Sequence, residues 1–123
     1  MGKKKILIVE DEESLLKLES ILLSSRGYEV VGVVNGKEAL DYLASNRVDL
    51  VLLDIMLPEI DGFEVCRRIK ENAATRDTPV VMLTAKKNPQ DQQKGLAAGA
   101  AAYITKPFKS ANIMELIQSL LAD

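Results

Sequence analysis

Five polar residues each stand at or just after the end of a short apolar run: Glu10, Asp11, Asp54, Thr84 and Lys106. Carboxylate oxygens are ligands that Mg2+ prefers, and a protein-bound Mg2+ usually keeps positions for substrate phosphate. A carboxylate can also act as a nucleophile and form an acyl phosphate. A lysine and a hydroxyl supply a positive charge and a hydrogen bond for phosphoryl oxygens. Together these residue types indicate phosphoryl transfer, in which a protein mainly positions the group and neutralises its charge.

The apolar runs themselves predict the strands that would position these residues. They are rich in Val, Ile and Leu and cover Lys5 to Val9, Tyr28 to Val33, Asp49 to Leu53, Pro79 to Leu83 and Ala101 to Thr105. Such unbroken apolar runs are typical of parallel strands that are buried on both faces. Segments with helical spacing follow each run, over Glu13 to Ser25, Lys37 to Ser45, Gly62 to Glu71, Pro89 to Ala98 and Ser110 to Ala122. This alternation predicts an α/β fold, (βα)5, with a doubly wound parallel sheet between two helical layers.

The carboxyl ends of parallel strands share one rim of the sheet, which is where open α/β sheets bind ligands. In the flavodoxin-like strand order 2-1-3-4-5, the ligand position lies between the first and third strands, so Glu10, Asp11 and Asp54 should meet there. At about 4 Å and an effective dielectric near 20, each pair of carboxylates costs on the order of 4 kcal/mol. We therefore expect a divalent cation among them. Asp54 is the expected nucleophile, because it stands alone after the most apolar strand.

Composition narrows the possible functions. The 123 residues, 47% of them hydrophobic, suit one domain with its own core, and we expect no output domain. Sixteen Lys and Arg against 18 Asp and Glu give a net charge of -2, which disfavours direct binding of nucleic acid. One cysteine and no histidine exclude disulfides and histidine-based catalysis and favour a cytoplasmic location. The apolar runs are far shorter than the roughly 18 residues that cross a bilayer, so we expect a soluble protein without membrane contact.

The whole chain resembles the receiver domain of response regulators, the phosphate-accepting module of two-component signalling. The segments that carry the resemblance are Ile6 to Glu12, Asp54 to Pro58 with Asp61-Gly62, Leu83 to Ala85, and Tyr103 to Phe108. The strand order 2-1-3-4-5 comes with the resemblance, since the chemotaxis receiver of this family is itself an example of that order. The resemblance implies a signalling domain that catalyses only its own phosphorylation and dephosphorylation.

The resemblance also implies a role for each residue of the rim. Asp54 would accept the phosphoryl group, and Asp11 and Asp54 would bind Mg2+ directly. Met56 would add its backbone carbonyl as a ligand, and Glu10 would act through a water molecule. Lys106 would pair with the phosphoryl oxygens.

A switch and a set of partners are implied as well. Thr84 would donate a hydrogen bond to the phosphoryl group, and Tyr103 would move inward behind it, changing the face made by helix four, strand five and helix five. The Lys106-Pro107 peptide bond would be cis. The phosphoryl donor would be a sensor histidine kinase or a histidine phosphotransfer protein, and the downstream target would be another protein. We expect a monomer or weak dimer, because Ala101 and Ala102 replace aspartates that many relatives have there.

Other interpretations compete with this one. A receiver-shaped interaction module that takes no phosphate stays open, whereas an aspartyl-phosphate phosphatase usually has a second aspartate where Met56 stands. A flavodoxin-like cofactor module would need a Gly-rich or Ser/Thr-rich loop after the first strand, and the sequence has none there. Two structural expectations are added: Asp61 caps the third helix, and Leu15 and Leu18 belong to the core.

Overall fold

Five strands alternate with five helices in the computed structural model, which describes residues 3–84, 89–105 and 110–121. The strands are β1 Lys5–Val9, β2 Glu29–Val33, β3 Leu50–Leu53, β4 Val80–Thr84 and β5 Ala102–Thr105. The helices are α1 Glu13–Ser25, α2 Gly36–Ser45, α3 Gly62–Glu71, α4 Pro89–Ala97 and α5 Ser110–Leu121. The predicted (βα)5 pattern is confirmed, with element ends that differ by about one residue from the apolar pattern. Thr84 is the last residue of β4 and not the residue after it.

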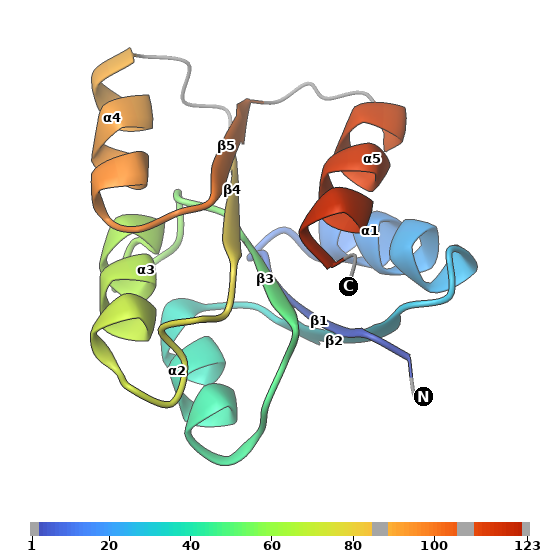
Figure 1. The fold of residues 1–123 in the computed structure, drawn as a ribbon, viewed down its shortest axis with the longest axis horizontal. Helices are drawn as coiled ribbons and strands as arrows, with labels where there is room; N and C mark the ends of the chain where they lie inside the picture. The colour runs from blue at the N-terminus through green and yellow to red at the C-terminus, as the bar shows by residue number, and fades with distance from the viewer. Residues whose placement is uncertain (1–2, 85–88, 106–109, 122–123) are drawn as a thin grey trace.

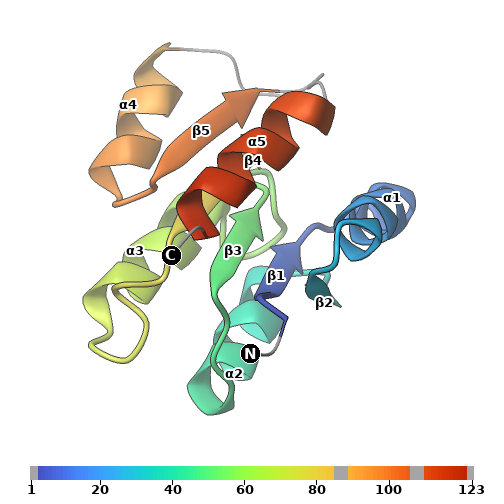
Figure 2. The same cartoon turned by 45° about the vertical axis from the view of Figure 1, so that its right-hand side comes forward.

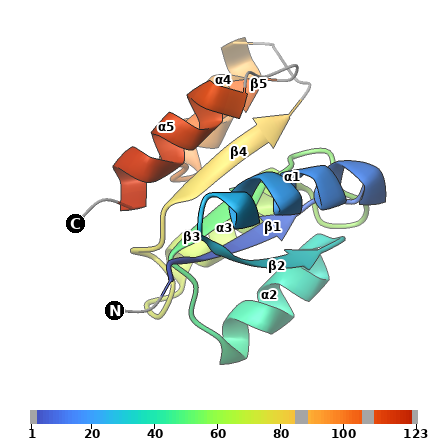
Figure 3. The ribbon, with the colours of Figure 1, turned by 90° about the vertical axis from the view of Figure 1, so that its right-hand side faces the viewer.

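The strands form one parallel sheet in the order β2-β1-β3-β4-β5, which confirms the predicted order. Figure 3 shows the arrows of β1, β2 and β4 pointing the same way. The register pairs Val9 with Leu53 at the ends of β1 and β3. The backbone N–H of Asp54 extends this ladder by donating to the Val9 carbonyl oxygen at 3.0 Å. The residues that follow the two strands, Glu10 and Asp54, therefore begin side by side.

Helices cover both faces of the sheet. Figures 1 and 2 show α2, α3 and α4 on one side and α1 and α5 on the other. Because successive side chains of a strand point to opposite faces, Leu7 and Val9 of β1 join one hydrophobic cluster and Ile6 and Ile8 the other. β1, β3 and β4 are buried almost throughout, while the edge strands β2 and β5 are largely half-buried. At about 1.5–3 kcal/mol for each fully buried aliphatic side chain, the three central strands anchor the rim where the polar residues lie.

Side-chain caps fix the starts of α2 and α3. Asp61 accepts a hydrogen bond from the backbone N–H of Glu64 at 3.0 Å, which confirms the predicted cap of α3. Asn35 caps α2 in the same way, accepting from the Glu38 N–H at 2.8 Å. No helix within the described ranges is both long and apolar enough to cross a membrane.

The expectation that Leu18 belongs to the core is wrong. Its exposed fraction is 52%, and only Leu15 of the predicted pair is half-buried. The face of α1 that packs inward contains Leu16, Glu19 and Leu23, and it lies one residue, or about 100°, around the helix from Leu15 and Leu18. The pattern of apolar residues misled here because a carboxylate, Glu19, occupies the middle of the buried face.

Candidate functional site

Three carboxylates meet at the carboxyl ends of β1 and β3. Oxygens from Glu10, Asp11 and Asp54 all lie within 4.8 Å of one another. Glu10 and Asp54 are buried, with exposed fractions of 2% and 7%, and Asp11 opens to solvent. At such separations like charges repel by about 3 to 4 kcal/mol per pair, for an effective dielectric near 20. The cluster is therefore suited to holding a hard divalent cation, which prefers oxygen ligands.

Backbone hydrogen bonds hold the two buried carboxylates in place. The N–H of Glu12 donates to Glu10 Oε2 at 3.3 Å, and the N–H of Met56 donates to Asp54 Oδ1 at 3.1 Å. The N–H of Glu10 also donates to the carbonyl oxygen of Val33 on β2 at 3.1 Å. Because the donors belong to the backbone, the orientation of both carboxylates follows from the paths of the loops after β1 and β3.

The close approach of α3 to the end of β3 depends on Gly62. A Cβ at this position would lie 2.5 Å from the carbonyl oxygen of Asp54 and 2.5 Å from the Cα of Ile55. The N–H of Gly62 donates to the Ile55 carbonyl oxygen at 2.9 Å, which ties the start of α3 to this loop. Any side chain here would push α3 away from the backbone that carries Asp54, so the Asp61-Gly62 pair supports the site structurally.

A hollow of about 480 Å3 opens beside the carboxylates. Asp11, Met56 and Lys94 are among the residues that line it, and Met56 has an exposed fraction of 56%. Lys94 extends from α4, and its Nζ lies 4.6 Å from the ring centroid of Phe63 on α3. The sequence contained no signal for Lys94, because its approach to the site depends on how α4 packs against α3.

Thr84 and Tyr103 lie beyond the carboxylate cluster on neighbouring strands. Thr84 is fully buried and is paired in register with Thr105, while Tyr103 is half-buried and is paired with Met82. Desolvation raises the pKa of the Tyr103 phenol, with a further contribution from the charge of Asp91 on α4. Met82 belongs to the hydrophobic cluster against which Tyr103 packs. By strand alternation, Thr84 and Tyr103 share this face of the sheet.

Two of the predicted site residues, Lys106 and Pro107, lie outside the described residues. The ion pair between Lys106 and phosphoryl oxygens and the cis Lys106-Pro107 bond therefore stay predictions. The structure brings together Glu10, Asp11 and Asp54 as predicted, and it places the backbone of Met56 three residues after the end of β3.

The fold and the acidic rim together define a doubly wound α/β domain with a candidate metal centre at its switch point. Residues 6–118 match the family model described as the response regulator receiver domain. The chain belongs to this family, as its sequence resemblance predicted, and is a signalling domain of the two-component type.

Known proteins of the family are similar over nearly the whole chain. Response regulator ArlR of Staphylococcus saprophyticus is 42% identical over 117 residues, which are 95% of this chain and 52% of ArlR. The polar-differentiation response regulator DivK of Brucella anthropi is 40% identical over 120 residues, 98% of each protein. The chain thus spans about half the length of ArlR and nearly all of DivK.

One solved receiver domain contains a magnesium ion. The receiver domain of the sensor histidine kinase PA1611 from Pseudomonas aeruginosa was crystallised with a magnesium ion coordinated in its active site cleft. It superposes on this chain with a TM-score of 0.91 at 32% identity, covering 99% of this chain and 100% of that one.

Proposed function

We propose that this domain accepts a phosphoryl group on Asp54 from a phosphohistidine, with Mg2+ bound beside it, and passes the change to a partner protein. The observation that carries the proposal is the cluster of Glu10, Asp11 and Asp54 oxygens within 4.8 Å at the end of a buried strand. The similarity to response regulators and to a magnesium-bound receiver supports the same reading.

The residues at the rim fit a magnesium ion. Three carboxylates supply hard oxygen donors and the negative charge that a divalent cation would offset. Asp11 and Asp54 would hold the ion directly, the backbone carbonyl of Met56 would add a ligand, and Glu10 would act through water. When bound, the ion would neutralise charge on the carboxylates and on the phosphoryl oxygens.

The chemical step belongs to Asp54. A carboxylate oxygen of Asp54 forms a bond to phosphorus while the N–P bond of the donor phosphohistidine breaks, and that electron pair returns to the imidazole nitrogen. The product is an acyl phosphate on Asp54 and an unmodified histidine on the donor. The Met56 N–H holds Asp54 Oδ1 at 3.1 Å, so the carboxylate is already oriented before the donor arrives. Lys106 pairs with the transferred oxygens.

The output follows from the buried hydroxyl on β4. The Thr84 hydroxyl donates to a phosphoryl oxygen, which draws the end of β4 toward Asp54 and leaves room behind it for Tyr103 to move inward. This is a two-state element that a local charge biases. The partners are then a histidine kinase or histidine phosphotransfer protein on one side and a downstream protein that reads α4, β5 and α5 on the other.

The test is phosphorylation by a small donor. With Mg2+ and acetyl phosphate, intact-mass analysis should show one added phosphoryl group on the native chain and none on Asp54→Asn. Asp49→Asn is a matched control, because Asp49 directly precedes β3 as Asp54 directly follows it, and this variant should be modified as the native chain is. Modification of Asp54→Asn would show that the acceptor is another residue. If acetyl phosphate and a panel of histidine kinases all fail with the native chain, a receiver-shaped interaction module is the better explanation.

A further inference from the structure

Helix α4 contacts the sheet through a glycine. Within Pro89–Ala97, Gly95 is the buried residue, and the other positions are exposed or half-buried. A Cβ built on Gly95 would lie 2.9 Å from Cδ2 and 3.3 Å from Cε2 of the Tyr103 ring, and 2.8 Å from Sδ of Met82. Carbon contacts of this length require a neighbour to move. The tyrosine ring therefore lies where the side chain of any other residue would have to be.

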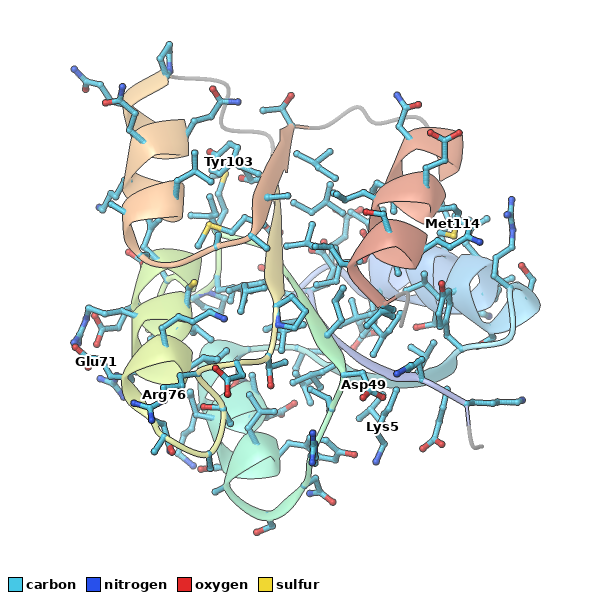
Figure 4. All side chains as sticks on the ribbon, in the orientation of Figure 1. Lys5, Asp49, Glu71, Arg76, Tyr103 and Met114 are labelled. Atoms are coloured by element: carbon cyan, nitrogen blue, oxygen red, sulfur yellow. The ribbon has the colours of Figure 1, made fainter. Side chains whose placement is uncertain are left out.

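A glycine at this place is costly to the helix itself. Glycine lowers helix stability relative to alanine in a helix interior, and α4 is a short and mainly polar helix. Among the described residues, α4 also contacts α3 through the cation-π contact of Lys94 with Phe63. The Tyr103 ring therefore lies at the contact between α4 and the sheet, and Figure 4 shows it between β5 and α4.

We propose that Gly95 is a positioning residue that couples the Tyr103 ring to helix α4, so that a change in the ring position changes how α4 sits on the sheet. The contact with Met82 places this junction in the register pair Met82–Tyr103, two residues before Thr84 on the same face of β4. A displacement of Thr84 would therefore move α4 through the contact between the Tyr103 ring and Gly95. The link to phosphorylation rests on the proposed function above, whereas the packing of the ring on Gly95 does not.

The ground state gives the first test. 3-Fluorotyrosine labels the three tyrosines, Tyr28, Tyr42 and Tyr103, and their 19F signals are assigned with Tyr28→Phe and Tyr42→Phe. Gly95→Ala should shift the Tyr103 signal and leave the other two signals unchanged. It should also speed amide hydrogen exchange in α4 by about tenfold or more, because the helix no longer packs closely on the sheet. Gln93→Ala is the matched control, because Gln93 is exposed and lies two residues away, on the opposite side of the helix.

An unchanged Tyr103 signal with unchanged exchange in Gly95→Ala, or equal changes in Gln93→Ala, would overturn the inference. If Gly95→Ala does not fold, Tyr103→Ala replaces it, since removing the ring should loosen α4 with the glycine intact. If the amides of α4 exchange as slowly in Tyr103→Ala as in the native chain, that result would count against the coupling.

Phosphorylation gives the second test. With acetyl phosphate and Mg2+, the native Tyr103 signal should move on phosphorylation, and in Gly95→Ala this movement should fall by at least half. Intact mass should show equal phosphorylation of both proteins, because Gly95 packs on Met82 and Tyr103 and does not line the hollow beside the carboxylates. Equal phosphorylation with an equal movement of the Tyr103 signal would refute the coupling. If the native chain takes no phosphate, the proposed function fails, and the ground-state comparison still decides the role of Gly95.

Discussion

Strand β3 is bracketed by two aspartates, and the surroundings of the two differ. Asp49, at the amino end, accepts the backbone N–H of Lys5 at 2.7 Å, and its own N–H donates to the Lys5 carbonyl oxygen at 2.8 Å. Figure 4 shows Lys5 and Asp49 next to each other. Asp54, at the carboxyl end, is gathered with two further carboxylates. At the amino end the acid accepts a hydrogen bond from the neighbouring strand, whereas at the carboxyl end the acid accepts the Met56 N–H of its own loop and lies among like charges.

Hollows do not distinguish the two ends. The hollow near Asp49 has a volume of about 520 Å3, and the one beside Asp11 about 480 Å3. What differs is the direction of the helices. α1 begins directly after Glu10–Glu12 and α3 begins soon after Asp54, so the positive ends of helix dipoles face the carboxyl rim. These positive ends partly offset the repulsion of the three carboxylates and favour an anion such as phosphate at this rim.

The largest effect that follows from this comparison concerns magnesium. At a concentration one hundred times its Kd, a ligand that binds only the folded state raises the free energy of unfolding by about 2.7 kcal/mol. We expect Mg2+ to stabilise the native chain in this way. Asp11→Asn should lose most of this gain, because it removes one of the carboxylates that would hold the ion. Denaturant unfolding with and without Mg2+ measures it, and Asp49→Asn should keep the full gain. Equal stabilisation of Asp11→Asn and the native chain by Mg2+ would show that the ion does not bind at this rim.

A smaller effect has opposite signs at the two ends of β3. Without Mg2+, Asp54→Asn should raise the free energy of unfolding by about 1–2 kcal/mol, because it relieves repulsion within the cluster that solvent only partly screens. Asp49→Asn should lower it by about 1 kcal/mol, since the amide replaces a charged acceptor of the Lys5 N–H by a neutral one. Chemical denaturation of the two variants at low ionic strength gives both numbers. The contrast between the two ends is wrong if the two changes have the same sign.

The carboxylate cluster could be predicted from the sequence because it needs only two properties, the ends of the apolar runs and the common direction of the strands. Glu10 and Asp54 follow β1 and β3 whatever the helices do. The orientation of α1 could not be predicted, since Glu19 lies on its buried face and breaks the apolar pattern. The contacts of α4 with Phe63 and Tyr103 also escaped prediction, because they join segments whose separation depends on packing of the whole domain.

The smallest effect tests how the amino end is stabilised. The Lys5 ammonium lies 3.7 Å from the Glu29 carboxylate. The pKa of Lys5 is raised above its ordinary value of 10.5, by Tyr42 first and also by Glu29, against the opposing effect of burial. A lysine with a raised pKa stabilises the fold at pH values below 10.5, and this contribution is lost as the pH rises through its folded-state pKa.

Glu29→Gln should therefore lower the pKa of Lys5 slightly, as seen by NMR titration of the lysine side chain. At pH 7 it should leave the free energy of unfolding unchanged within error, because exposed ion pairs contribute little and Tyr42 remains. Glu115→Gln, which changes an exposed carboxylate of α5 and raises the net charge by the same amount, controls for a general effect of altered net charge. A loss of stability as large as that of Asp49→Asn would mean that the ion pair secures the amino end. The backbone bond from Lys5 to Asp49 would then be secondary, and the contrast between the two aspartates of β3 would have to be explained by side-chain charge at both ends.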